Sequence, residues 1–133
     1  MKTIEPKKYK IRVVRGAFVD PDLLDELGAK TIEKLEHGGW ESIDEVVVDL
    51  GRIKELQKNM TRHYDDTVVP WYMDGYDAKD RNKLVVAFGA DDGEGGKIFK
   101  FLRNDKREIG EVVKYGISKG IPKEQMDFAD IDF

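Results

Sequence analysis

The most apolar stretch of the chain is Leu84-Val85-Val86-Ala87-Phe88, and it constrains the fold more than any other feature. A run of apolar residues without alternation is typical of a strand that is buried on both faces. Turn-forming residues follow at 91–96, and a second apolar stretch covers 97–102. The sequence therefore predicts a β-hairpin with a central first strand, so the chain is expected to fold around a sheet.

Residues 8–15 alternate basic and apolar side chains, which predicts a half-buried strand with Tyr9, Ile11 and Val13 facing inward. Near the other end of the chain, Asp105 followed by Glu108 forms a capping box. This pattern predicts a helix that continues to about residue 119.

Residues 20–60 carry the signals of two helices. Asp20-Pro21 predicts a helix start, and His37-Gly38-Gly39 predicts its end. Ser42 and Glu45 form a second capping box, followed by an apolar stripe at helical spacing that extends to Met60. A short turn between the two segments predicts an αα-hairpin.

The remaining segments complete the predicted fold. Residues 67–73 predict a strand that Pro70 confines to an edge or a bulge, and 74–82 predict a polar loop. The order β-α-α-β-β-β-α predicts an α+β domain. We expect a mainly antiparallel sheet of four to five strands, covered on one face by the αα-hairpin and the C-terminal helix. The whole chain, 1–133, is expected to form one domain, and 125–133 a docked or disordered tail or a final strand.

Composition excludes several kinds of chemistry. The 133 residues include no cysteine and two histidines, so disulfides, thiolate nucleophiles and thiolate metal sites are excluded. No apolar run approaches the roughly 20 residues of a membrane span. We expect a cytoplasmic domain without a cofactor and without a membrane partner. Scarce Ser and Gln beside abundant charged residues resemble the composition of thermophile proteins.

Charge is distributed unevenly along the chain. Residues 1–16 and 97–119 are rich in Lys and Arg, whereas 20–50 are rich in Asp and Glu. If the first strand and the strand at 97–102 were neighbours, their basic side chains would form one surface for nucleic acid. That surface would contain Lys8, Lys10, Arg12, Lys97, Lys100, Arg103, Lys106 and Arg107. A pI near 5.3 argues against this interpretation.

Two short motifs resemble catalytic signatures. Gly116-Ile117-Ser118-Lys119-Gly120 matches the string of a nucleophile elbow, but a helical segment precedes it and no histidine follows. Its glycines are better explained as the end of a helix. His63, beside Tyr64-Asp65-Asp66, and His37 are the only imidazoles, and the sequence favours solvated positions for both.

The loop that follows the predicted central strand contains Asp91, Asp92 and Glu94. Carboxylates in this position are suitable ligands for Mg²⁺ or Ca²⁺. The spacing is not that of an EF-hand, and glycines with acids also form an ordinary hairpin turn. A cation site at these three residues is therefore an alternative to a simple turn.

Aromatic residues gather at 70–76, where Trp71, Tyr72 and Tyr76 could line a ligand pocket or anchor a partner. The competing interpretation places Trp71 in the core and Tyr72 on the surface.

Taken together, the motifs favour a small binding or interaction module without catalytic machinery. One alternative is an enzyme or cation-binding protein that uses the carboxylates of residues 91–94, and a second is a nucleic-acid binder with a basic sheet face. The sequence does not identify a partner, and a protein partner or a homo-oligomer fits the apolar tail.

Overall fold

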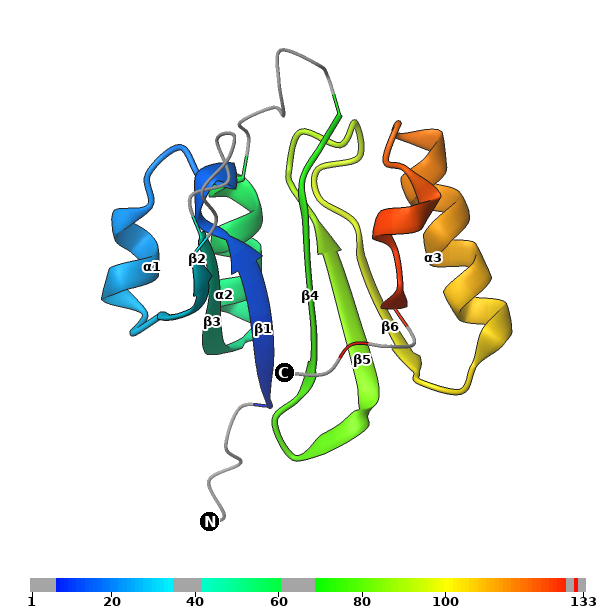
Figure 1. The fold of residues 1–133 in the computed structure, drawn as a ribbon, viewed down its shortest axis with the longest axis horizontal. Coiled ribbons are helices and arrows are strands. Elements are labelled where there is room, and N and C mark those ends of the chain that lie inside the picture. Colours follow the sequence, from blue (N-terminus) through cyan, green and yellow to red (C-terminus); the bar gives the residue numbers. More distant parts are fainter. Residues whose placement is uncertain (1–6, 35–41, 61–68, 129–130, 132–133) are drawn as a thin grey trace.

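The computed structural model describes residues 7–34, 42–60, 69–128 and 131. It is an α+β fold built on one antiparallel sheet of six strands in the order β2-β3-β1-β4-β5-β6 (Figure 1). The strands are β1 (Lys8–Val14), β2 (Lys30–Lys34), β3 (Ser42–Asp49), β4 (Tyr72–Asp77), β5 (Asp80–Phe88) and β6 (Ile98–Leu102). The helices are α1 (Asp22–Glu26), α2 (Leu50–Asn59) and α3 (Lys106–Ser118), with short 3-10 turns η1 (Arg15–Ala17) and η3 (Lys123–Gln125).

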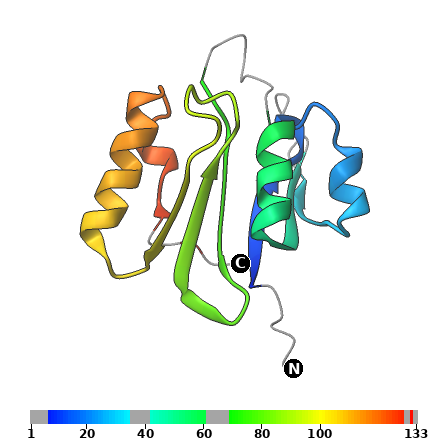
Figure 2. The same ribbon diagram turned by 180° about the vertical axis from the view of Figure 1, so that it is seen from behind.

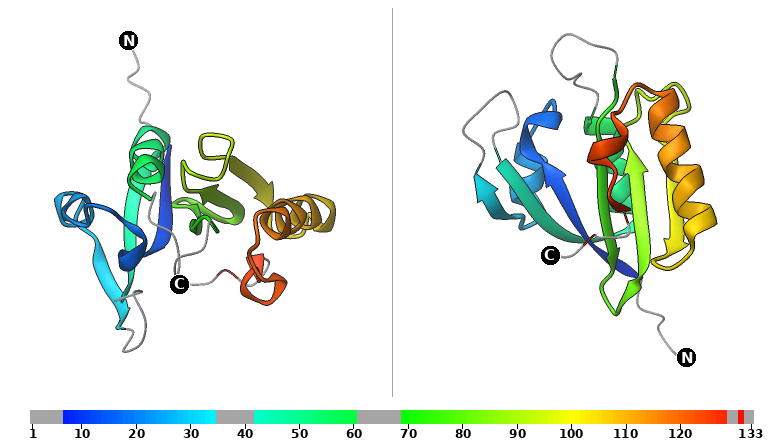
Figure 3. Two further views of the ribbon diagram at one scale, coloured as in Figure 1. Left: turned by 90° about the horizontal axis from the view of Figure 1, so that it is seen from above. Right: turned by 45° about the vertical axis from the view of Figure 1, so that its right-hand side comes forward.

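Helices cover both faces of the sheet, rather than the one face expected from the sequence (Figures 1 and 2). On the first, which we call the α2 face, α1 and α2 pack on β1 and β3, and this core extends to Met73, Val85 and Ala87. On the opposite α3 face, α3 and the C-terminal residues pack on β4, β5 and β6. The view from above shows the two coverings at opposite ends of the sheet (Figure 3). Helices therefore cover the β1 and β3 half of the sheet on the α2 face and the β4 to β6 half on the α3 face.

Several predictions are confirmed. β1 alternates as expected, with Tyr9, Ile11 and Val13 buried. The hairpin of β5 and β6 forms, and β5 is buried on both faces over its last five residues. At α3, the Asp105 side chain accepts a hydrogen bond from the Glu108 backbone N–H at 3.1 Å.

The predicted αα-hairpin is wrong. Residues 42–49 form strand β3, in which Ser42, Asp44, Val46 and Val48 point to the buried face. The hydroxyl of Ser42 donates to the Asp44 carboxylate at 2.8 Å instead of capping a helix. Polar side chains at two inward positions thus hid the alternation of a strand, and the capping role belongs to Asp49, which accepts from Arg52 N–H at 2.9 Å.

The long helix predicted from Asp20 to His37 is also wrong. Helix α1 ends at Glu26, and Gly28 follows with a φ of 75°, a left-handed conformation that favours glycine. The chain then turns into β2, where β-branched Thr31 and Ile32 suit an extended backbone. The sheet consequently has six strands instead of four or five.

Two further predictions fail around Pro70. Strand β4 begins after this proline and lies between β1 and β5, so it is neither an edge strand nor bulged by Pro70. The predicted loop at 74–82 forms the end of β4 and the start of β5. Asp74 and Asp77, which resembled loop residues, are buried strand residues because cationic side chains pair with them.

The described part of the C-terminal tail packs on the α3 face rather than adding a strand. Met126, Phe128 and Ile131 are buried there, and the Phe128 ring lies 5.6 Å from the Tyr72 ring in an edge-on arrangement. Phe133 lies outside the described residues. No helix in the described part of the chain is long and apolar enough to cross a membrane.

Candidate functional site

A pocket of about 500 Å³ opens on the α3 face, where the cover formed by α3 and the tail ends. Four segments contribute to it: β1, β3, the chain that leads into β4 together with the start of β4, and the residues that follow α3. The described lining residues are Arg12, Val13, Val14, Ile43, Val69, Pro70, Trp71, Tyr72, Asp74, Gly120, Ile121, Pro122 and Gln125. Most of them are apolar, which is typical of small-molecule sites.

The strand register places an ion pair in this pocket. Arg12 of β1 lies opposite Asp74 of β4, and both side chains are on the α3 face. The guanidinium donates from Nε to Oδ1 at 2.6 Å and from Nη2 to Oδ2 at 3.0 Å. The side chain of Asp74 is 7% exposed and that of Arg12 is 36% exposed. The hydrogen bond to Asp74 raises the pKa of Arg12 and so stabilises its charged form.

Tyr72 joins the pocket to the tail. Its hydroxyl donates to the backbone carbonyl of Gln125 at 2.7 Å, which holds one wall of the pocket in place. Burial, together with the Asp74 carboxylate, raises the pKa of Tyr72, so the phenol remains protonated at neutral pH.

The structure separates the three aromatic residues singled out in the sequence. Trp71 and Tyr72 both line the pocket, although Trp71 also packs against the core of the α2 face. Tyr76 lies deeper in the core of the α3 face and is not a lining residue. Its ring is contacted by Lys10 Nζ at 6.0 Å and by Arg81 Cζ at 5.2 Å from the centroid. A ligand or partner site at these three aromatic residues thus stays a prediction. Two of them, Trp71 and Tyr72, lie at a cavity.

The carboxylate of Asp92 already accepts hydrogen bonds from within its own loop and from α3. Its oxygens accept from the backbone N–H groups of Glu94 (2.8 Å), Gly96 (3.0 Å) and Lys97 (3.0 Å) and from the Tyr115 hydroxyl (2.6 Å). Glu94 forms an ion pair with Lys119 at 3.6 Å. Among the residues that the structure describes, no three His, Asp or Glu side chains form a group that could hold a metal ion. A cation site at Asp91, Asp92 and Glu94 stays a prediction. The geometry does not favour it, because the carboxylates of Asp92 and Glu94 already have protein partners.

The condition for the predicted basic surface, that the first strand and the strand at 97–102 are neighbours, is not met. β1 and β6 are separated by β4 and β5, so their basic residues do not lie on neighbouring strands. Lys10 and Arg12 instead form ion pairs with Glu45 and Asp74. His37 and His63 lie outside the described residues, and 116–120 form the end of α3 and the residues after it.

The pocket could not be found from the sequence because its parts are distant along the chain. Arg12 and Asp74 are 62 positions apart, and Ile121 with Pro122 come from a third segment. Only Tyr72 and Trp71 gave a local signal. Comparison with protein-family models, curated proteins and solved structures yields no match for this chain.

Proposed function

We propose that this domain binds a small organic molecule in the pocket beside the Arg12–Asp74 pair. The observation that carries the proposal is the combination of a cavity of about 500 Å³, a mainly apolar lining and one convergent pair of charged groups. Pockets of roughly 300–1,000 Å³ with a few placed polar groups are typical of small-molecule sites. The apolar lining supplies affinity, and the ion pair supplies orientation.

The surrounding structure supports a site that is formed before the ligand arrives. Cross-strand pairs of the sheet hold Val14 opposite Ile43 and Arg12 opposite Asp74. The tail wall is anchored by the Tyr72–Gln125 hydrogen bond and by buried Met126 and Phe128. Because these groups are already ordered, binding costs less conformational entropy than it would in a loop.

The test is a fragment screen followed by ¹H–¹⁵N NMR, with small neutral aromatic and aliphatic compounds. We expect shifts to concentrate at the amides of Val14, Ile43, Tyr72 and Ile121. Ile43→Trp should fill the pocket and weaken binding at least about tenfold. The matched control is Val47→Trp, because Val47 lies on the same face of β3, is 50% exposed and does not line the pocket.

Two results would overturn the proposal. In one, the shifts of all bound fragments map away from the pocket. In the other, Ile43→Trp and Val47→Trp bind the fragments equally well while both variants keep the wild-type fold by NMR.

A further inference from the structure

The charges of the described residues that line the pocket sum to zero. Among the described residues that line it, Arg12 and Asp74 are the charged ones, and they are paired with each other. A ligand cation would approach Arg12, and a ligand anion would approach Asp74, and the described lining contains no further charged residue to compensate either. Because transfer of an uncompensated charge into an apolar site is costly, the pocket favours an uncharged molecule.

Asp74 keeps acceptor capacity that faces this pocket. A carboxylate has about four lone-pair sites. The side chain of Asp74 receives two hydrogen bonds, both from Arg12, and is 7% exposed. Among the described residues, three other carboxylates are buried to a similar degree. Asp44 and Asp92 receive donors from at least three different residues each. Asp77 accepts from the Lys79 backbone N–H and pairs with Lys7, and it does not line the pocket. Asp74 is therefore the buried carboxylate that both lines the pocket and has acceptor sites left for a further donor.

We infer that the pocket selects neutral, mainly apolar molecules that carry one N–H or O–H donor and give it to Asp74. This inference rests on the proposed function and specifies its ligand class. The apolar body of such a molecule contacts side chains such as Val14, Ile43 and Ile121, while its donor reaches the carboxylate that Arg12 holds in place. Hydrogen bonds to a charged acceptor are stronger than neutral ones, so the donor supplies most of the selectivity.

Two isomers provide the sharpest test, because they differ only in the position of one methyl group. 3-Methylindole retains the ring N–H, whereas 1-methylindole has lost it, and their apolar content is the same. We expect the wild-type protein to bind 3-methylindole at least about tenfold more tightly in an NMR titration. Indole-3-acetate and tryptamine, which add a negative and a positive charge, should both bind more weakly than 3-methylindole.

A double variant assigns the preference to the ion pair. Arg12→Met with Asp74→Leu replaces both charges by apolar groups, and it should bind the two isomers within about twofold of each other. Lys10→Met with Glu45→Leu is the matched control, since this ion pair of 3.5 Å also joins β1 to a neighbouring strand, β3, on the same face but does not line the pocket. The control should retain the wild-type preference.

The outcomes separate the two proposals. If wild-type protein binds both isomers in the pocket with equal affinity, the donor-selective inference is wrong and the proposed function stands. If neither isomer and no fragment of the neutral screen shifts the NMR signals of the pocket amides, both the proposed function and the donor-selective inference are wrong. Should the apolar double variant fail to fold, the comparison of the isomers on wild-type protein still decides the inference.

Discussion

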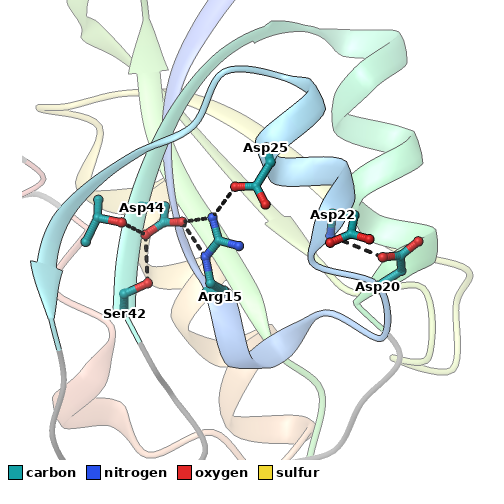
Figure 4. Close-up of polar contacts among 7 residues, drawn as sticks. Arg15, Asp20, Asp22, Asp25, Ser42 and Asp44 are labelled. Atoms are coloured by element: carbon teal, nitrogen blue, oxygen red, sulfur yellow. Dashed lines mark hydrogen bonds and ion pairs between the residues drawn. The ribbon is translucent and has the colours of Figure 1, made fainter.

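Two buried aspartates, Asp44 and Asp74, are each paired with an arginine near the same end of β1, yet their surroundings differ. Asp44 is fully buried and accepts hydrogen bonds from Arg15, Thr31 and Ser42 at 2.8–3.0 Å (Figure 4). A second guanidinium nitrogen of Arg15 lies 2.9 Å from Asp44 and also contacts Asp25 of α1 at 2.8 Å. Asp74 receives hydrogen bonds only from Arg12 and lies at a pocket.

The number of hydrogen-bond donors distinguishes Asp44, which has a structural role, from Asp74, which can accept a donor from a ligand. With its acceptor sites occupied, Asp44 fixes η1, β2 and β3 relative to one another, and Arg15 extends the connection to α1. Asp74 has fewer protein donors and an open space beside it, so an added donor can be accommodated without displacing a contact. Buried carboxylates in a small domain can therefore be sorted by their number of donors and by access to a cavity.

The largest expected effect is at the structural carboxylate. Asp44→Ala should lower the free energy of unfolding by about 4 kcal/mol, because it leaves Arg15 without its buried partner and also removes the acceptor of Thr31 and Ser42. Urea denaturation at neutral pH measures this loss. Asp25→Ala serves as the control, since the Asp25 side chain is 63% exposed and its removal should change the midpoint far less. Equal losses in both variants would contradict the proposed structural role.

A second variant tests the close approach of strands that brings Arg12 to Asp74. Gly75 of β4 lies opposite Ile11, and a Cβ added there would be 2.0 Å from the Lys10 carbonyl oxygen and 2.8 Å from Ile11 Cα. Because backbone atoms must move, Gly75→Ala should destabilise the fold by about 3 kcal/mol. Thermal unfolding measures this loss, and Gly110→Ala is the control because its added Cβ meets nothing within 4 Å. A Gly75→Ala variant as stable as the control would show that β1 and β4 can separate freely.

The same residues explain what could be predicted from the sequence and what could not. Segments whose burial follows their hydrophobicity, such as Leu84–Phe88 and the alternating β1, were predicted correctly. Prediction failed where a polar residue occupies an inward position: Ser42 resembled a helix cap with Asp44 in the helix that follows, and Asp74 resembled a loop residue. Their burial depends on Arg15 and Arg12, which are 29 and 62 positions away from the two aspartates, and local patterns do not contain that information.

Asp92 resembles Asp44, because protein donors also occupy its carboxylate. The variant Tyr115→Phe removes one of the four donors to Asp92. The desolvation of Asp92 by itself raises the pKa, but the hydrogen bonds from Tyr115 and three backbone N–H groups outweigh it and lower the pKa. Loss of the Tyr115 hydroxyl should cost about 1.5 kcal/mol at pH 7. Since the folded-state pKa lies below the unfolded value of about 3.9, this contribution is present above pH 4 and is lost as the pH falls through the folded-state pKa.

The difference in stability between wild type and Tyr115→Phe should therefore shrink between pH 7 and pH 2, as measured by chemical denaturation across that range. Tyr9→Phe provides a comparison, because the Tyr9 ring is contacted by the ammonium groups of Lys7 and Lys100 rather than by a carboxylate. A pH-independent difference for Tyr115→Phe would mean that its hydroxyl does not hold the ionised form of Asp92.

The smallest effect on stability is expected at the pocket pair itself. Arg12→Met with Asp74→Leu should change the free energy of unfolding by less than about 1 kcal/mol, because apolar residues of similar volume replace both charges together and neither remains unpaired. Arg12 is 36% exposed, so solvent already screens part of the attraction that is lost. Urea denaturation of this double variant beside Asp44→Ala tests the central distinction directly. If removing the pocket pair destabilises the fold as much as removing Asp44 does, then Asp74 also serves the fold, and the number of donors to a buried carboxylate does not separate structural from binding roles in this protein.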